Sequence, residues 1–165
     1  MAKKAFYSFE YLPDYWRAAK VRQIGSIEGN QSISDNDWEK VKSGRDPAIE
    51  HWINAQLVGR SCVIVLIGSS TANRRWVKYE IEQGWNMNKG IVGIHIHNLL
   101  DRYNRQATKG ANPFSNFTIN GVTPLSSVVK TYDPPYVTSS SVYGYIATNL
   151  EQWVNEAIAI RAKYR

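Results

Sequence analysis

Glu80 and the segment before it are the part of this sequence best suited to do chemistry. An apolar run at 62–67 is followed by the polar segment 69–73, and then by Trp76 and Glu80. The run is too short for a helix and is rich in β-branched residues, which predicts a strand buried on both faces. The polar segment marks the carboxyl end of that strand and the start of a helix, and ligands bind at this edge of open α/β sheets.

Glu80 lies within the apolar arc of the predicted helix. With Trp76 at the origin and about 100° per residue, Glu80 lies at about 40° and Val77 at about 100°. A carboxylate on a core-facing stripe costs free energy unless it is paired or used. One interpretation is a carboxylate at the helix flank, in an ion pair with Arg74, Arg75 or Lys78. We favour a functional carboxylate, because Glu80 comes one turn into a helix that begins at the ligand edge of the sheet.

A buried carboxylate beside aromatic side chains and serines suits the cleavage of a glycosidic bond. Such a reaction builds positive charge on a ribose, and one carboxylate can orient the ribose hydroxyls and stabilise that charge. Aromatic walls would hold the departing base. Three other signatures are missing from the sequence: Gly-x-Gly-x-x-Gly, the P-loop and the Gly-x-Ser-x-Gly elbow. We expect no metal site, because His95 and His97 have no Cys or carboxylate at ligand spacing nearby.

The elements that must position Glu80 alternate between strands and helices. The patterns predict strands at 4–9, 31–34, 62–67, 91–96 and 127–132, and helices at 11–24, 47–57, 76–89 and 143–164. In the first helix Trp16 is expected to face inward, and Gly90 is expected to close the third. The segment 35–46 is predicted to be a surface loop, and 98–125 a long polar connection of the kind that is usually functional or mobile.

This alternation predicts an α/β fold of the flavodoxin-like type. We expect a sheet of about five mostly parallel strands with helices on both faces, and the strands 4–9 and 62–67 side by side. In that arrangement Ser8, Trp76 and Glu80 surround one cleft at the carboxyl ends of the strands.

Composition places the chain among ordinary globular proteins. It has 165 residues, 43% hydrophobic and 21% charged, which favours a single domain over 1–165. It has no apolar run of membrane-spanning length and no apolar segment behind the N-terminus, and its single cysteine, Cys62, falls in a predicted buried strand. We therefore expect no membrane partner and a cytoplasmic location. The net charge of +6 would suit phosphates, but the basic residues are scattered, so no nucleic-acid partner is expected.

Several of these segments resemble Toll/interleukin-1 receptor (TIR) domains. Phe6-Tyr7-Ser8-Phe9 is similar to the aromatic-x-Ser-aromatic motif of their first strand, and Trp76-Val77-Lys78-Tyr79-Glu80 is similar to the Trp-x-x-x-Glu of the helix after their third strand. More closely, the segments 4–9, 65–69, 73–81 and 91–96 resemble the TIR-like proteins of the bacterial Thoeris antiphage system. Asn112-Pro113-Phe114 also fits. The block 73–80 is the most specific of these matches.

The resemblance implies that Glu80 is the catalytic residue for cleavage of NAD+ at the nicotinamide–ribose bond. NAD+ would be the substrate and no bound cofactor is needed. The product would be a cyclic ADP-ribose isomer or a related nucleotide that activates a separate effector protein in antiphage defence. The segment 35–45 would correspond to the BB loop, which TIR domains use to gate the pocket and to form homo-oligomers, and a phage-derived trigger would start the reaction. The expected pocket lining is Phe6, Ser8, Phe9, Ser69, Ser70 and Trp76.

Three other functions stay open at this point. The first is a non-catalytic TIR-like scaffold for protein interactions, with Glu80 as a surface ion-pair partner. The second is a nucleoside glycosyl-transferring enzyme on a similar sheet, and the third is a nucleic-acid binder. Assays of NAD+ loss, of free nucleosides and of salt-dependent DNA binding distinguish them.

Overall fold

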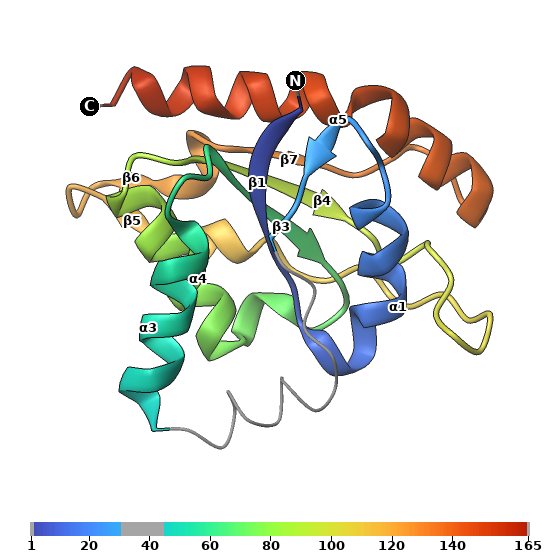
Figure 1. Ribbon diagram of the computed structural model, residues 1–165. Helices are drawn as coiled ribbons and strands as arrows, with labels where there is room; N and C mark the ends of the chain where they lie inside the picture. The colour runs from blue at the N-terminus through green and yellow to red at the C-terminus, as the bar shows by residue number, and fades with distance from the viewer. Residues whose placement is uncertain (1, 31–44, 165) are drawn as a thin grey trace.

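A five-stranded parallel sheet forms the centre of the molecule (Figure 1). The structure is a computed structural model that describes residues 2–30 and 45–164. The strand order is β2-β1-β3-β4-β7, and each neighbouring pair runs parallel. The strands are β1 (Lys3–Ser8), β2 (Ile27–Glu28), β3 (Cys62–Ile67), β4 (Gly90–His95) and β7 (Lys130–Tyr132). The prediction of a flavodoxin-like α/β fold with β1 beside β3 is confirmed, and the main sheet is wholly parallel.

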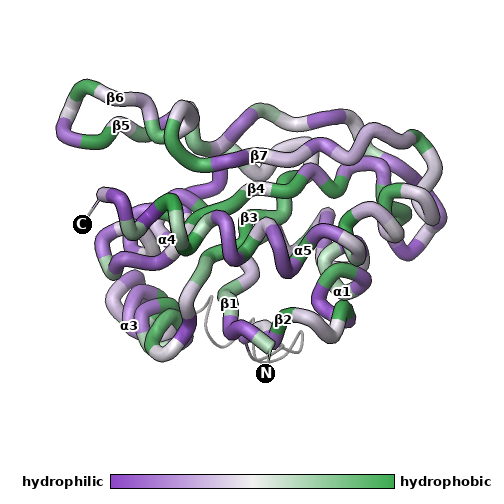
Figure 2. Tube along the Cα trace, turned by 90° about the horizontal axis from the view of Figure 1, so that it is seen from above, coloured by the Kyte–Doolittle hydropathy of each residue, from purple (hydrophilic) through white to green (hydrophobic). Residues whose placement is uncertain are grey.

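Helices cover both faces of this sheet: α1 (Tyr11–Arg22), α3 (Asp46–Leu57), α4 (Arg75–Asn86) and α5 (Ser139–Ala162). Because successive strand residues point to opposite faces, Val63 and Val65 pack in the hydrophobic layer with α3 and α4. Ile64 and Leu66 pack in the layer with α1 and α5. Seen along the perpendicular direction, the hydrophobic centre of β3 and β4 lies between these helices (Figure 2).

One residue of the first helix, Trp16, departs from its predicted orientation. Trp16 is 47% exposed, whereas Asp14 and Arg17 are buried. The reason is that Arg17 is satisfied inside the protein: its guanidinium lies 2.9 Å from Asp14 Oδ1 and donates to the carbonyl oxygens of Leu99 and Arg105. A buried polar pair therefore occupies the face that the apolar pattern had assigned to Trp16.

The segments between these elements differ from prediction in detail. The strand β2 lies at Ile27–Glu28, and the predicted strand 31–34 and most of the loop 35–46 lie outside the described residues. The long connection after β4 contains short 3-10 turns and the antiparallel pair β5 (Thr118–Ile119) and β6 (Thr123–Pro124), and is anchored by the buried Phe114. The helix α5 begins at Ser139 rather than Tyr143. No helix in residues 2–30 and 45–164 is both long and apolar enough to cross a membrane.

Gly90 does not close α4, which ends at Asn86 and is followed by Asn88 with a positive φ of 63°. Gly90 instead begins β4 directly beneath α5. A Cβ at this position would lie 2.6 Å from the backbone nitrogen of Ile158. The glycine therefore allows the close approach of strand and helix.

We expect Gly90→Ala to lower the free energy of unfolding by about 1 to 3 kcal/mol, because the methyl group would force two packed backbones apart. Urea unfolding followed by tryptophan fluorescence measures this. The matched control is Gly144→Ala in α5, where a Cβ meets nothing within 4 Å and stability should rise by up to about 1 kcal/mol. Equal stability of Gly90→Ala and the parent would contradict the packing described here.

Candidate active site

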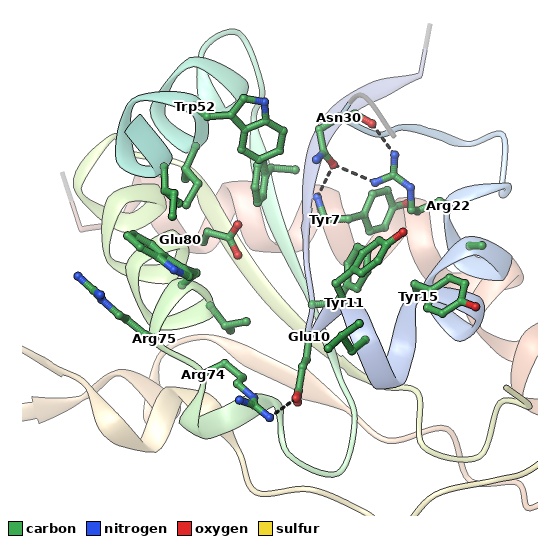
Figure 3. A pocket seen from close by; sticks show the side chains of 18 residues that line it. Tyr7, Glu10, Tyr11, Tyr15, Arg22, Asn30, Trp52, Arg74, Arg75 and Glu80 are labelled. Carbon is green, nitrogen blue, oxygen red and sulfur yellow. Dashed lines mark hydrogen bonds and ion pairs between the residues drawn. The ribbon is translucent and has the colours of Figure 1, made fainter. Parts of the chain in front are cut away.

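A cavity of about 420 Å³ opens beside the carboxyl end of β1 (Figure 3). Its described walls come from the end of β1 and the helix α1 on one side, and from α3 and the first turns of α4 on the other. Its volume lies within the range of small-molecule sites, which is roughly 300 to 1,000 Å³. It lies at the sheet edge where parallel α/β folds bind ligands.

Glu80 extends into this cavity from the second turn of α4 and is only 9% exposed. Ser8, the last residue of β1, donates a hydrogen bond from its Oγ to Glu80 Oε1 at 2.7 Å. Trp76 lies one turn earlier on α4 and also lines the cavity. The structure thus brings Ser8 to the same place as Trp76 and Glu80, although Ser8 lies 72 residues before Glu80 in the sequence.

Burial decides the electrostatics of Glu80. It raises the pKa of this carboxyl to about 8, and the hydrogen bond from Ser8 opposes the rise. Glu80 forms no ion pair with any residue that the structure describes. The arginines that could have neutralised it are paired elsewhere, Arg74 with Glu10 and Arg75 with Asp46. The helix-flank ion pair considered from the sequence is therefore not what the structure contains.

A carboxyl with this pKa is mostly protonated at pH 7, and a positive charge placed next to it would favour the carboxylate. The site can therefore stabilise a cation that forms or binds inside the cavity. Its walls are largely apolar and aromatic, with Phe9, Trp52 and Trp76 among the lining residues. This combination suits an aromatic, positively charged group.

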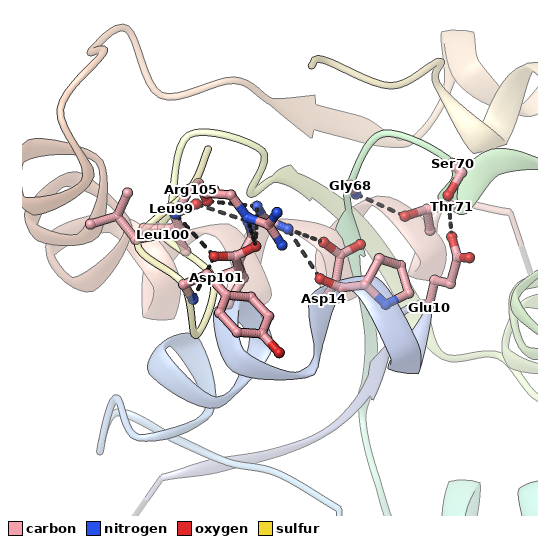
Figure 4. Close-up of polar contacts among 12 residues, drawn as sticks. Glu10, Asp14, Gly68, Ser70, Thr71, Leu99, Leu100, Asp101 and Arg105 are labelled. Atoms are coloured by element: carbon pink, nitrogen blue, oxygen red, sulfur yellow. Dashed lines mark hydrogen bonds and ion pairs between the residues drawn. The ribbon is translucent and has the colours of Figure 1, made fainter. Parts of the chain in front are cut away.

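The other residues expected in the pocket fall into two groups. Phe6 and Phe9 line the cavity together with Trp76. Ser69 and Ser70 are not among its lining residues. The hydroxyl of Ser70 donates to the Glu10 carboxylate (Figure 4). Ser69 borders a second hollow of about 370 Å³, between α1 and the segment 101–107.

Much of the cavity wall that α1 and α3 contribute was not predicted from the sequence. Tyr11 and Tyr15 stack with ring centroids 5.3 Å apart and line the cavity, together with Arg22 and Asn30. Trp52 of α3 lies on the opposite side. Their position in the sequence could have indicated Tyr11 and Tyr15. Both come directly after the carboxyl end of the first strand, where ligand-binding residues are found in such sheets.

His95 and His97 lie apart from this cavity. Their rings meet edge to face with centroids 5.8 Å apart. Burial lowers the pKa of both, that of His95 to about 4. Within 2–30 and 45–164 no three His, Cys, Asp or Glu side chains are grouped so that they could hold a metal ion.

Comparison with known proteins gives two findings. The profile of the family described as "Thoeris protein ThsB, TIR-like domain" matches residues 6–101. A curated protein of Bacillus cereus (strain MSX-D12), named "Putative cyclic ADP-D-ribose synthase ThsB1", is 41% identical over 120 residues, which are 69% of this chain and 62% of that protein. The chain therefore spans less than two thirds of the length of this relative. The matched family segment includes Ser8, Trp76 and Glu80.

Proposed function

The chain belongs to the family of Thoeris ThsB TIR-like domains, and we propose that it cleaves NAD+ at the nicotinamide–ribose bond, with Glu80 as the catalytic residue. One observation carries the proposal. Glu80 is a buried carboxyl, held by Ser8 and without a cationic partner among the described residues, in a cavity with aromatic walls. The name of the relative, a cyclic ADP-ribose synthase, supports the same chemistry.

The proposed reaction moves a positive charge from the nicotinamide ring to the ribose. The bond between ribose C1′ and the nicotinamide nitrogen breaks, and its electron pair leaves with nicotinamide as a neutral base. The Glu80 carboxylate stabilises the oxocarbenium-like ribose and accepts hydrogen bonds from its hydroxyls. Attack on C1′ by a group of the same molecule gives a cyclic ADP-ribose, attack by water gives ADP-ribose, and either releases one proton.

The neighbouring side chains prepare Glu80 for this role. The cationic nicotinamide ring of NAD+ would favour the ionised carboxyl, which offsets the effect of burial on its pKa. Ser8 holds one carboxyl oxygen and so fixes the direction of the other. Phe9, Trp52 and Trp76 would pack against the nicotinamide ring and keep water from the reacting bond.

The wider setting of the reaction is part of the same proposal. The product would be a signal nucleotide read by a separate effector protein in the cytoplasm, during defence against phage. A phage-derived trigger and assembly of several copies would control the activity. The test compares purified protein with and without extract from phage-challenged cells, and follows NAD+ loss, nicotinamide release and the masses of new nucleotides. An activated sample that leaves NAD+ unchanged would favour the scaffold function instead.

Ser8→Ala tests the support of the catalytic carboxyl. The Ser8 hydrogen bond lowers the pKa of Glu80. Without it, the increase of kcat/KM that accompanies ionisation of Glu80 should occur at higher pH. At pH 7 we expect a loss of activity of about tenfold to a hundredfold, since a hydrogen bond to a charged group contributes roughly 1.5 to 3 kcal/mol. Rates of nicotinamide release from pH 6 to 9 measure both effects.

Ser69→Ala is the matched control for Ser8→Ala. Ser69 follows the neighbouring strand and lies outside the Glu80 cavity, so its variant should keep the parent profile. A Ser8→Ala profile identical to that of the parent would show that the hydrogen bond does not serve the reaction.

A further inference from the structure

Three arginines line the Glu80 cavity, and they differ in their partners. Arg74 lies against the Glu10 carboxylate, and Arg75 Nη2 lies 2.6 Å from Asp46 Oδ2. Arg22 takes part in none of the ion pairs formed by the described residues. Of the three cations, Arg22 is therefore the one whose charge no described carboxylate balances.

Arg22 is nevertheless held in a built arrangement. Its Nη1 donates to Asn30 Oδ1 at 3.0 Å, and its Nη2 donates to the backbone oxygen of the same residue. Asn30 is buried and its Oδ1 also accepts a hydrogen bond from the backbone nitrogen of Tyr7 at 2.9 Å. The guanidinium carbon lies 5.4 Å from the centroid of the Tyr7 ring. Asn30 and Tyr7 thus fix the guanidinium at the cavity wall.

This arrangement leaves the guanidinium with binding capacity. An arginine has five N–H donors in a planar fork that matches phosphate oxygens. Among the residues that the structure describes, Arg22 donates hydrogen bonds only to Asn30. Arg22 is half-buried, and this burial lowers its pKa. An anion that accepted hydrogen bonds from the guanidinium would compensate for the water that burial removes, and would bind there favourably.

Arg22 and Glu80 occupy opposite walls of the same cavity. Figure 3 shows Glu80 extending from α4, and Arg22 on the side of α1 beside Asn30. One end of the cavity therefore favours a positively charged group and the other a negatively charged group. NAD+ has this polarity, with a cationic nicotinamide riboside joined to an anionic pyrophosphate.

We propose that Arg22 binds the pyrophosphate of NAD+ and thereby places the nicotinamide ribose at Glu80. This inference rests on the proposed NAD+ cleavage and adds the group that selects a dinucleotide over a plain nucleoside. Asn30 is the residue that positions Arg22. The pyrophosphate is bound equally before and during bond cleavage, so its binding should appear in KM rather than in kcat.

The test compares Arg22→Gln with the parent on two ligands that share the reacting bond. NAD+ contains the pyrophosphate, and nicotinamide riboside does not. Binding is measured by calorimetry in the Glu80→Gln background, where no turnover interferes, and KM and kcat are measured in activated samples. We expect Arg22→Gln to weaken NAD+ binding roughly tenfold to a hundredfold, with kcat within about twofold and the affinity for nicotinamide riboside unchanged.

Two further variants complete the design. Arg22→Lys keeps the charge but not the fork, so its NAD+ affinity should fall between those of the parent and Arg22→Gln. Lys20→Gln removes the same charge from the same helix outside the cavity lining, and should bind NAD+ as the parent does. Unchanged binding of nicotinamide riboside also shows that Arg22→Gln is folded.

The possible failures are distinguishable. If the parent cleaves NAD+ and Arg22→Gln binds NAD+ as tightly, the assignment of Arg22 is wrong and the proposed function stands. If Arg22→Gln weakens both ligands equally, Arg22 has a structural role only. If the parent neither binds nor cleaves either ligand, even after activation, the proposed function fails and the pyrophosphate site fails with it.

Discussion

Glu80→Gln is expected to lower the rate of NAD+ cleavage by about a hundredfold or more while the protein stays folded. Gln matches the shape of Glu and can still form a hydrogen bond with Ser8, but it has no negative charge to stabilise the oxocarbenium-like ribose. The loss should therefore fall mainly on kcat. Nicotinamide release by parent and variant, both activated by the same phage-challenged extract, measures it.

The matched control for this loss is Glu82→Gln. Glu82 belongs to the same helix but is exposed to solvent, so the variant should retain the parent rate. Were Glu80 only a helix-flank ion pair, its replacement would change stability by at most about 1 kcal/mol and leave activity intact. A Glu80→Gln protein with the parent rate would remove Glu80 from the mechanism.

The second large effect concerns stability and pH. Burial raises the pKa of Glu80 from 4.5 to about 8 in the folded protein. Below pH 4.5 the carboxyl is neutral in both the folded and the unfolded state, so its titration does not change the free energy of unfolding. Between pH 4.5 and 8 the Glu80 carboxyl ionises in the unfolded chain but stays protonated in the folded protein. Each pH unit in this range therefore lowers the free energy of unfolding by about 1.4 kcal/mol. Above pH 8 the carboxyl is ionised in both states, and the free energy of unfolding falls no further on its account.

Glu80→Gln removes this titration, so the variant should become more stable than the parent as pH rises. The difference in free energy of unfolding should grow by on the order of 4 kcal/mol from pH 4.5 to 8. Urea titrations at several pH values measure it. Asp14, which is also buried with a raised pKa, is present in both proteins and cancels in the difference. A difference that does not change with pH would show that the Glu80 carboxyl is not desolvated.

Local signals in the sequence were sufficient for the centre of the fold. The buried strand β3 has the predicted bounds, and α3 and α4 begin within a residue or so of the expected positions. The carboxyl ends of adjacent parallel strands lie at one edge, so the strand order alone brought Ser8 close to the start of α4. The contact between Ser8 and Glu80 followed from these two facts.

Other features depend on tertiary contacts that a periodic pattern does not encode. The face that α1 buries is set by Asp14 and Arg17, whose polarity is compensated by carbonyl groups distant in sequence. Ser69 and Ser70 have the composition of a ligand loop, but the turn after β3 takes them to other partners. Arg22 is an ordinary helix residue in the sequence, and only its tertiary contacts place it beside Asn30 and away from every described carboxylate.

A crystal structure of the Glu80→Gln protein with NAD+ bound tests the central claim most directly, because the variant should bind the substrate without consuming it. We predict that the nicotinamide ribose lies within hydrogen-bond distance of the side chain at position 80, about 3.2 Å, with the nicotinamide ring against Phe9 and Trp76. NAD+ bound outside this cavity, or with its ribose far from position 80, would contradict the claim that Glu80 acts on the glycosidic bond.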